Sequence, residues 1–505
     1  MQHDGSMCGP ALPQQQQQHG RVARLGRALC ECAADIEAGS TEKAARRLSQ
    51  ATGLTAATGD GPLPRLAVLV ADGLARRLIR PMVPAVAGAL IDPSDHLNRC
   101  CVRAARRSFF ELSPFPKAAV AVVNRVILEA MENEKNVHVI DFAGPAAQPC
   151  QWIQLLRDFH SRPEGAPHLR LTIVQDDKEF LANVSESLTD EADDLDVPFQ
   201  VHCVAGQIET LDFNDLHGVL GLKSGEARAI VCTKQLHRLL ASVDDAASSS
   251  FSAGHHFNQM ASIARLQQMA ASSSCPPSIG GGGVACEVHD DDDSYRSPAT
   301  PLGFVSPPLT TPRFQMPPAL VGFLSAARAA VSPKVVVLTE QEASHNGVSF
   351  RKRFTEALNY YAAAFDSLDA AAAAYRRPVA ERADVERAVL GEEIRDVLLR
   401  EGARRLERHD RLHQWGLRME VAGFRSVPLS YIAIRQGDDM LRMCGVRGCE
   451  SREHGGCLLL CWRSWPLYSV SAWRPDRGSA YGVGSEYLPL SAPPAPAPSI
   501  EELMC

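Results

Sequence analysis

The stretch Asn136-Val137-His138-Val139-Ile140-Asp141-Phe142 decides how the chain folds. It is short and almost continuously apolar, which is typical of a strand buried on both faces of a parallel sheet. In open α/β sheets, the loops that leave the carboxyl ends of the strands form the crevice where ligands bind. Asp141 ends this strand, so it is a candidate cofactor-binding residue. A carboxylate in this place is also typical of a turn or a helix cap.

Apolar runs of strand length alternate with helical patterns after this stretch. The sequence predicts strands near 137–142, 169–174, 199–204, 229–233 and 334–339. It predicts helices near 149–160, 178–195 and 349–374. This alternation predicts a doubly wound, mostly parallel sheet of the Rossmann or methyltransferase type. Farther on, residues 457–462 and 467–473 flank Ser464-Trp465-Pro466 and predict a β-hairpin that closes one edge of the sheet.

The N-terminal part of the chain has helical periodicity. Apolar residues recur at intervals of three and four from Leu25 to Ile36, and at intervals of four from Leu66 to Leu78. We therefore expect an α-helical, leucine-rich cap over residues 25–132, on an α/β core of residues 133–475. Apolar stripes of this kind pack inside their own domain or against a second chain.

Three segments have too few apolar residues or too many prolines and glycines to pack. Residues 1–24 contain a glutamine run, residues 244–318 contain clusters of serine, glycine, aspartate and proline, and residues 476–505 are rich in proline and alanine. We expect a disordered tail at each end and a low-complexity insert that forms a surface loop or tether within the core.

The overall composition limits the possible partners. The 505 residues carry a net charge of −7, whereas DNA-binding domains usually present a basic face. No apolar run approaches the roughly 20 residues of a membrane helix, so we expect no membrane partner. The start of the chain lacks the features of a signal peptide, and the fifteen cysteines form no regular framework. We expect reduced, intracellular thiols.

Several blocks of the sequence resemble the plant GRAS family of transcriptional regulators. The opening stretch, followed by Gln151-Trp152, resembles the VHIID block of that family, and residues 353–368 resemble its PFYRE block. Ser471-Ala472-Trp473 resembles the SAW block, in which Trp415, Gly423, Trp462 and Trp473 have the family spacings. The resemblance covers about residues 25–475 without the insert, and it is greatest to scarecrow-like members.

The resemblance implies a nuclear transcriptional co-regulator in gibberellin signalling and root development. It implies pairing with DELLA and other GRAS proteins, as a homodimer or heterodimer, through the helical cap. Zinc-finger proteins of the INDETERMINATE-DOMAIN class would supply the DNA contact, so that DNA is bound indirectly. It further implies that the protein is not an enzyme and holds no cofactor.

Candidate family-motif and partner-binding residues come from these blocks and from two further patterns. The pattern Leu-x-x-Leu-Leu at residues 236–240 matches helical coactivator-docking motifs, although such leucines are mostly core residues. Mixed charges at residues 401–411 predict a salt-bridged outer helix face. A groove between the tryptophan block and helices at 349–422 would bind partners, since exposed Trp and Arg anchor interfaces and otherwise pack in cores. The candidates are His138, Asp141, Gln151, Trp152, Leu236, Leu239, Leu240, Arg404, Glu407, Arg408, Trp415, Gly423, Trp462 and Trp473.

Two other functions stay open: a methyltransferase-like enzyme that uses S-adenosylmethionine, and a direct DNA binder. The turn at 143–149 has one glycine and two prolines, whereas a phosphate-cradling turn needs two or three glycines and free amides. No Gly-x-Ser-x-Gly elbow or His-Glu-x-x-His motif is present, and the adjacent Cys100 and Cys101 lack zinc-ligand spacing. We therefore expect no catalytic residue, no cofactor and no metal.

Overall fold

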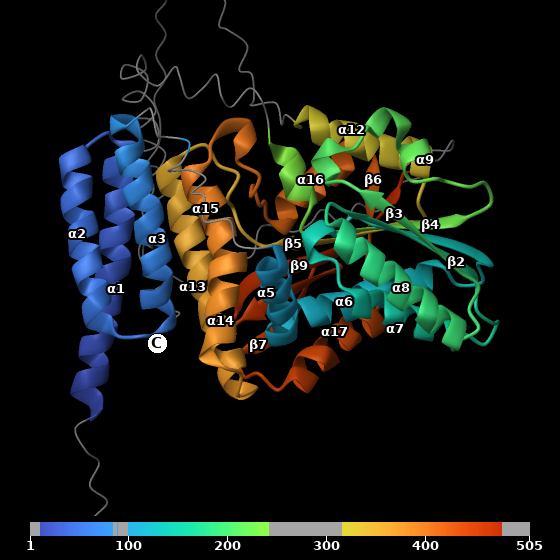
Figure 1. Cartoon of the computed structure of the whole chain (residues 1–505), viewed down its shortest axis with the longest axis horizontal. Helices are drawn as coiled ribbons and strands as arrows, with labels where there is room; N and C mark the ends of the chain where they lie inside the picture. Colours follow the sequence, from blue (N-terminus) through green and yellow to red (C-terminus); the bar gives the residue numbers. More distant parts are fainter. Residues whose placement is uncertain (1–10, 84–87, 89–98, 242–315, 477–505) are drawn as a thin grey trace, which may run out of the picture. The chain divides into compact units, whose positions relative to one another are not determined.

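A computed structural model describes residues 11–83, 88, 99–241 and 316–476. Almost all of the insert expected at 244–318 and of the tail expected at 476–505 lies outside these ranges. The described strands form one nine-stranded sheet in the order β3-β2-β1-β4-β5-β9-β8-β7, and β6 pairs with β9. Figure 1 shows this sheet with the N-terminal helices α1, α2 and α3 on its α13 and α15 side.

The first five strands are parallel and confirm the predicted doubly wound sheet. They are β1 (Asn136–Asp141), β2 (His168–Gln175), β3 (Phe199–Ala205), β4 (Ala227–Thr233) and β5 (Val335–Gln341). β1, β2 and β3 follow one another to one side, and β4 returns to the other side of β1. The strand order therefore reverses between β1 and β4, which is where open α/β sheets bind ligands.

The remaining strands are antiparallel to their neighbours: β6 (Phe424–Val427), β7 (Cys449–His454), β8 (Cys457–Trp462) and β9 (Trp465–Pro475). The predicted hairpin is β8–β9, but its turn is Arg463-Ser464, whose φ angles are 45° and 66°. Two positive φ angles match the twist of a two-residue hairpin. Trp465 and Pro466 therefore belong to β9. The edge strands are β3 and β7, so neither strand of this hairpin is at an edge: β9 lies between β5 and β8, and β8 lies between β9 and β7.

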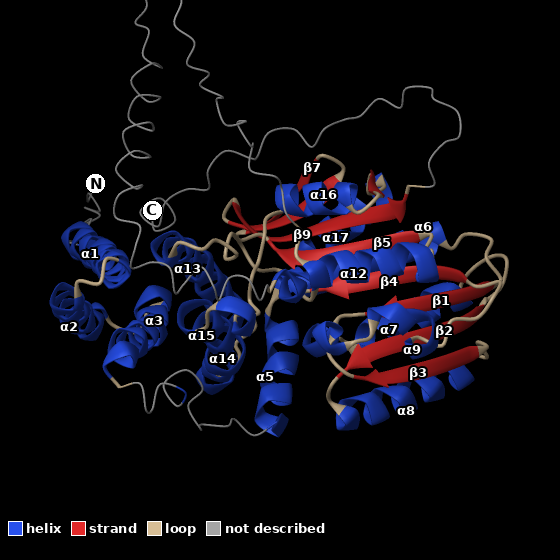
Figure 2. Ribbon diagram, turned by 90° about the horizontal axis from the view of Figure 1, so that it is seen from above, coloured by secondary structure: helices blue, strands red, loops and turns tan. Residues whose placement is uncertain are grey.

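Alternating side chains of the parallel strands enter two hydrophobic cores, one on each face of the sheet. Leu459 and Cys461 of β8 instead form a small third cluster with Leu412. Val137 and Val139 of β1 belong to the first core, and Ile140 belongs to the second. Helices α6 (Pro114–Ala130), α7 (Pro149–His160), α8 (Lys178–Asp194), α13 (Phe350–Ala374) and α17 (Tyr431–Cys444) contribute to the first core. Helices α12 (Pro318–Ala326), α9 (Leu216–Val219) and α16 (Leu412–Val421) contribute to the second. Figure 2 looks onto the face that α12 covers.

The helical cap consists of α1 (Ala11–Glu37), α2 (Thr41–Thr58) and α3 (Pro62–Ile79), which pack on α13 and α15 (Gly391–Leu399). The predicted stripe runs from Leu66 to Leu78: Leu66, Val70 and Leu74 are buried inside this chain, and Leu78 is partly buried against the first core. Because α1 begins at Ala11, residues 11–24 are helical and not the disordered tail that the sequence predicted. No described helix is both long and apolar enough to cross a membrane.

The second half of the predicted cap range has a different position. Helix α5 (Arg99–Leu112) contacts α14 (Val379–Val385) and the π-helical turn Glu386–Leu390, and α6 contacts β5, β9 and α17. Thus α6 packs on the sheet, and α5 lies between the sheet and the helices that carry the cap. This arrangement leaves space at the carboxyl ends of the parallel strands.

Candidate functional site

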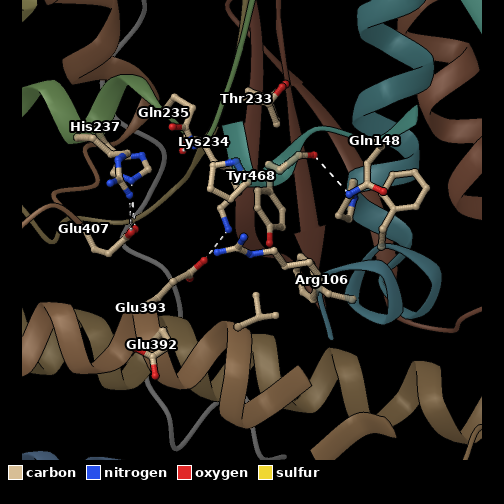
Figure 3. A pocket seen from close by; sticks show the side chains of 18 of the residues that line it. Arg106, Gln148, Thr233, Lys234, Gln235, His237, Glu392, Glu393, Glu407 and Tyr468 are labelled. Atoms are coloured by element: carbon tan, nitrogen blue, oxygen red, sulfur yellow. Dashed lines mark hydrogen bonds and ion pairs between the residues drawn. The ribbon is translucent and has the colours of Figure 1, made fainter. Parts of the chain in front are cut away.

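A cavity of about 600 Å³ lies beside the point where the strand order reverses between β1 and β4 (Figure 3). Thr233 at the end of β4 lines it, together with Lys234 and Gln235 of the following loop and Pro145 and Gln148 of the loop after β1. Its volume is within the range of about 300–1,000 Å³ that is typical of small-molecule sites. This cavity is therefore the candidate functional site.

Apolar side chains from α5 and α6 line much of the cavity. Phe109 and Phe110 come from α5, Val120 and Val123 come from α6, and Ala388 comes from the π-helical turn before α15. Apolar lining with a few placed polar groups is the usual composition of a small-molecule site, because the apolar surface supplies affinity and the polar groups fix orientation.

A buried ion pair joins the loop after β4 to α15 within the cavity lining. Lys234 Nζ lies 2.6 Å from Glu393 Oε1. Burial alone would lower the pKa of Lys234, but the charge of Glu393 overcomes this effect and raises it. Glu393 also accepts hydrogen bonds from Gln341 Nε2 at 2.9 Å and Tyr361 Oη at 3.3 Å. Lys234 has φ 56°, a rare conformation for a residue other than glycine that is often found at functional sites.

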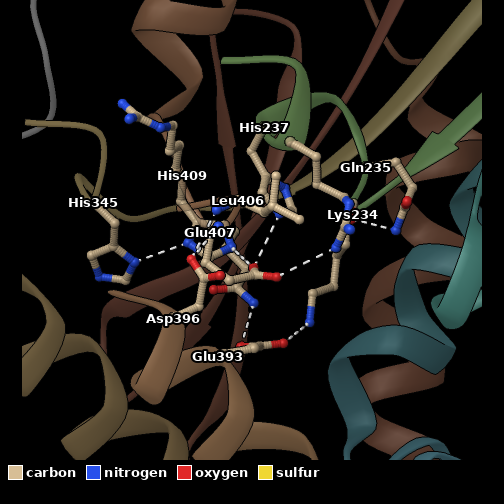
Figure 4. A network of polar contacts seen from close by, with 12 residues as sticks. Lys234, Gln235, His237, His345, Glu393, Asp396, Leu406, Glu407 and His409 are labelled. Atoms are coloured by element: carbon tan, nitrogen blue, oxygen red, sulfur yellow. Dashed lines mark hydrogen bonds and ion pairs between the residues drawn. The ribbon is translucent and has the colours of Figure 1, made fainter. Parts of the chain in front are cut away.

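A second buried network surrounds His237 (Figure 4). His237 Nδ1 lies 2.8 Å from Glu340 Oε2, and its Nε2 lies 3.1 Å from Glu407 Oε2. Burial alone would lower the pKa of His237, but the two carboxylates overcome this effect and raise it to about 9. A protonated His237 therefore donates to both glutamates at neutral pH. Glu340 also accepts hydrogen bonds from the backbone N–H of Gln235 and Leu236.

The network continues through two further histidines. His409 Nε2 lies 3.1 Å from Glu407 Oε2, and the Nδ1 atoms of His409 and His345 lie 2.9 Å apart. Burial and the neighbouring His237 lower the pKa of His409. His237, Glu407 and His409 offer ligand atoms within 4.8 Å of one another, and zinc binds such groups. A metal would have to displace the proton of His237, so the present contacts form an ion-paired network.

Arg106 of α5 differs from the other cations that line the cavity in its lack of a partner. Its side chain extends into the cavity in Figure 3. Burial lowers its pKa, although a guanidinium stays charged in proteins. Among the described residues, Arg106 has no hydrogen-bond or ion-pair partner. The other arginines of the lining have carboxylate partners in the pairs Arg238–Glu209, Arg395–Glu392 and Arg400–Asp396.

The candidate residue Asp141 is fully buried and does not line this cavity. Its Oδ1 accepts the backbone N–H of Ala143 at 2.7 Å, and its Oδ2 accepts the indole N–H of Trp152 at 3.0 Å. Burial raises the pKa of Asp141 to about 7, although both donors lower it. These contacts give Asp141 the turn-forming role. Gln151 does line the cavity, and its backbone carbonyl accepts a hydrogen bond from Asn124.

The turn after β1 does not fit a nucleoside cofactor. Gly144 accepts a hydrogen bond from Gln175 Nε2, and a Cβ at Gly144 would lie 2.9 Å from Gln235 Oε1. A second, smaller cavity, which Gly144 lines, has a volume of about 140 Å³, which is below the size of typical small-molecule sites. The glutamine side chains therefore fill the space that a phosphate-cradling turn leaves open.

His138 lies on the opposite face of β1 from Val137 and Val139. Its Nε2 is 2.8 Å from Thr172 Oγ1, and its Nδ1 is 2.9 Å from the guanidinium of Arg170. Burial and the charge of Arg170 lower the pKa of His138 to about 3. Arg170 in turn pairs with Glu226 at 2.8 Å. His138 thus links neighbouring strands as a neutral side chain.

The three leucines of the docking pattern are buried. Leu236, Leu239 and Leu240 belong to a short 3₁₀ helix and pack in the second hydrophobic core. A docking helix must expose its leucines to the partner, so this segment does not offer a docking surface in the described fold.

The tryptophan block is also buried, and its members lie on different faces of the sheet. Trp415 and Trp473 pack in the second core, whereas Trp462 packs in the first. The indole N–H of Trp462 donates to Asp366 Oδ2 at 2.7 Å, and that of Trp473 donates to Ser471 Oγ at 2.9 Å. The expected partner groove with exposed tryptophans is therefore not present among the described residues.

Gly423, the fourth position of that block, ends α16. It has φ +80°, and a Cβ there would lie 2.7 Å from the guanidinium of Arg328. The family spacing between Trp415 and Gly423 thus runs from within α16 to the glycine that follows its C-cap residue, Ala422.

The arginine-rich run at 401–411 is mainly a buried loop and not the predicted outer helix face. Arg408 is buried and donates to the carbonyls of Arg405 and Gly402 and to Asn346 Oδ1. Arg404 is exposed in the short turn Gly402–Arg404, and Glu407 belongs to the His237 network. Buried arginines of this run donate hydrogen bonds to backbone carbonyls, because each buried carbonyl needs a hydrogen-bond partner.

Arg106, Lys234 and Glu393 were not predicted as site residues. A usable signal existed for Arg106 alone, because Val102, Arg106 and Phe109 recur at intervals of four and three on α5 and therefore share one helix face. No local pattern marks the pair of Lys234 and Glu393.

Comparisons with known proteins agree with this architecture. The GRAS domain family matches residues 25–474. The chain is 38% identical to Scarecrow-like protein 3 of Arabidopsis thaliana over 88% of both chains. It is 28% identical to DELLA protein GAIP of Cucurbita maxima, over 90% of this chain and 62% of that protein. The crystal structure of SCL7 from Oryza sativa matches with a TM-score of 0.62 and 27% identity, over 89% of this chain and 99% of that chain. The chain therefore belongs to the GRAS domain family.

Proposed function

We propose that this protein is a nuclear transcriptional co-regulator that acts through protein contacts in gibberellin signalling and root development. Membership of the GRAS family, with scarecrow-like and DELLA relatives, supports a regulator of plant transcription and development. The observation that carries the proposal is the match to Scarecrow-like protein 3 along 88% of both chains. The net charge of −7 favours indirect DNA binding, because phosphate contacts need lysine and arginine.

The cap supplies the proposed contact with DELLA and other GRAS proteins. Its leucine stripe is buried, but α3 and the turn after it expose Val68, Ile79 and Met82. Val68 and Ile79 are eleven residues apart, about three helical turns, so they share one face of α3. Exposed apolar residues on one helix face suit a homodimer or heterodimer interface. Zinc-finger proteins of the INDETERMINATE-DOMAIN class would supply the DNA contact.

Calorimetry with the full chain tests the proposal. We expect heat of binding from an INDETERMINATE-DOMAIN zinc-finger protein and from a DELLA protein. Val68→Glu and Ile79→Glu should weaken DELLA binding about tenfold or more, because they place a charge in an apolar interface. Lys43→Glu is the matched control, since Lys43 is an exposed cap residue on α2, and it should bind like the wild type.

The same titrations separate the competing functions. Absence of binding to both partner proteins would contradict the adaptor role. Heat from S-adenosylmethionine alone would instead support a methyltransferase-like enzyme. Salt-sensitive, sequence-selective binding to duplex DNA without a partner would support a direct DNA binder.

A further inference from the structure

We propose that the cavity beside the β1–β4 reversal binds a small amphipathic molecule that carries a single carboxylate, with Arg106 as the partner of that carboxylate. This ligand site is separate from the protein contacts proposed above. Three features of the described residues support it: a partly open cavity with apolar side chains from α5 and α6, the unpaired guanidinium, and two buried polar atoms without partners.

The volume and lining suit a molecule with an apolar body. About 600 Å³ is available. Two consecutive helices supply apolar lining residues: α5 supplies Phe109 and Phe110, and α6 supplies Val120 and Val123. Burial of an apolar body against such side chains stabilises a complex by roughly 25 cal/mol per Å² of apolar surface removed from water. The interior therefore favours a hydrocarbon or ring framework over a sugar or nucleotide.

Among the charged residues that line the cavity, Arg106 is the cation that makes no ion pair, although Asp176 and Glu393 act on it from a distance. Lys234 pairs with Glu393, and His237 pairs with Glu340 and Glu407. The lining arginines other than Arg106 also have carboxylate partners, as described above. A charged group within an apolar site is costly unless it is paired. An anionic ligand would remove this cost at Arg106.

A carboxylate fits this environment better than a phosphate. The planar guanidinium of Arg106 matches the two oxygens of a carboxylate in a bidentate contact. Glu392 and Glu393 line the same cavity, and only one cation is unpaired. A phosphate monoester would bring a second negative charge toward these glutamates, so a monoanion is preferred.

Two further lining residues have buried polar atoms that no described residue satisfies. Gln151 and Thr339 are 4% and 3% exposed, and Gln151 Nε2 and Thr339 Oγ1 have no hydrogen-bond partner. Leaving such an atom unsatisfied costs about 1–3 kcal/mol. A hydroxyl or carbonyl oxygen on the ligand body would accept from Gln151 Nε2, and a hydroxyl would also serve Thr339 Oγ1. The ligand class is therefore an apolar monocarboxylic acid, and an oxygen on its body would reach these two atoms once the side chain of Gln151 or Thr339 turns toward the cavity.

Fluorescence titration of the full chain with dansyl-labelled undecanoic acid tests the site. This probe has an apolar chain and one carboxylate, and its primary amide is the matched neutral ligand. We expect saturable binding of one acid per chain, with the amide bound about tenfold more weakly because it lacks the charge that Arg106 pairs.

Three variants locate the binding. Arg106→Met should weaken the acid about tenfold, to the level of the amide, without changing the affinity for the amide. Arg107→Met is the matched control, because Arg107 is the exposed neighbour of Arg106 on α5, and it should bind both ligands like the wild type. Val120→Trp should abolish binding of both ligands by filling the cavity, and circular dichroism and thermal unfolding verify that each variant is folded.

Failure of the wild type to bind either ligand would overturn the proposal. Equal affinity for acid and amide, or no effect of Arg106→Met, would overturn the assignment of Arg106. Unchanged binding by a folded Val120→Trp variant would show that the probe binds elsewhere and would overturn the cavity as the site.

Discussion

The indole N–H of Trp152 donates to Asp141 Oδ2 over 3.0 Å, and both side chains are buried. Asp141 ends β1, and Trp152 lies in the first turn of α7, so this bond fixes the angle at which the chain leaves the strand. The same carboxylate accepts a hydrogen bond from the backbone N–H of Ala143 in the intervening turn. Two separate segments of the VHIID block are thus joined by one hydrogen bond.

We predict that Trp152→Phe lowers the free energy of unfolding by about 1–3 kcal/mol at pH 8, because the ionised Asp141 carboxylate loses a donor in a buried site. The loss should be smaller at pH 5.5, since the pKa of Asp141 is about 7 and the neutral carboxyl group needs less stabilisation. Urea unfolding at the two pH values measures the difference.

Trp462→Phe is the matched control for this experiment. Its indole also donates to a carboxylate, at 2.7 Å from Asp366 Oδ2, but the Asp366 side chain is 31% exposed and retains solvent contact. The loss of unfolding free energy in Trp462→Phe should therefore be similar at pH 8 and at pH 5.5. An equal pH dependence in the two variants would contradict the role assigned to Asp141.

The parallel strands were predictable because burial on both faces requires nearly continuous apolar runs. Every residue of β5 is buried, and its predicted position differs from the observed one by only one or two residues. Two local predictions were wrong. Residues 11–24 are helical, because glutamine has a high helix propensity even without an apolar stripe. The β8–β9 turn lies at Arg463-Ser464, neither of which is the glycine or asparagine that marks such turns.

A second prediction concerns alkaline pH and His237. Its folded-state pKa, about 9, is above the value of about 6.5 for an unfolded chain. Its ion pairs therefore contribute fully below about pH 6.5, and the contribution is lost as the pH rises through about 9. We expect the free energy of unfolding to fall by up to about 3 kcal/mol across this window.

His237→Gln should remove that pH dependence, and the difference between wild type and variant isolates it from other titrating groups. His168→Gln is the control, because His168 is exposed at the start of β2. If the wild type and His237→Gln showed parallel profiles between pH 6.5 and 9.5, the charged state assigned to His237 would be wrong.

The cavity was harder to predict than the sheet. Asp141 was correctly placed at the end of a strand, but its side chain turns into the protein to meet Trp152. Lys234 and Glu393 are 159 residues apart in the sequence, and only the packing of α15 against the loop after β4 brings them together. A single sequence contains no periodic signal for such a pair, because periodicity reports one element and its own buried face.

A third prediction compares two glycines that end helices with positive φ. Gly39 has φ +71° with open space around its Cα, whereas a Cβ at Gly423 would lie 2.7 Å from Arg328. Gly39→Ala should cost about 1–2 kcal/mol from backbone strain alone. Gly423→Ala should cost more, since the Arg328 guanidinium must also move. Thermal and urea unfolding compare the two variants.

An Arg328→Ala background tests the cause of that difference. In this background, the cost of Gly423→Ala should fall to that of Gly39→Ala, because the clashing side chain is absent. If the cost stayed the same, the contact with Arg328 would not explain the glycine at this position.

The final prediction distinguishes a buried leucine from a docking leucine. Leu239 is buried in the second core, so Leu239→Ala should lower the free energy of unfolding by about 2–5 kcal/mol through lost burial and a residual cavity. Val421→Ala is the control, because Val421 is 65% exposed and its truncation should change stability by less than about 0.5 kcal/mol. A Leu239→Ala variant with wild-type stability and weakened binding to a partner protein would show that the segment opens to dock. Because all three leucines pack in the second core, we expect Leu239→Ala to lose stability in the chain alone, without any partner protein.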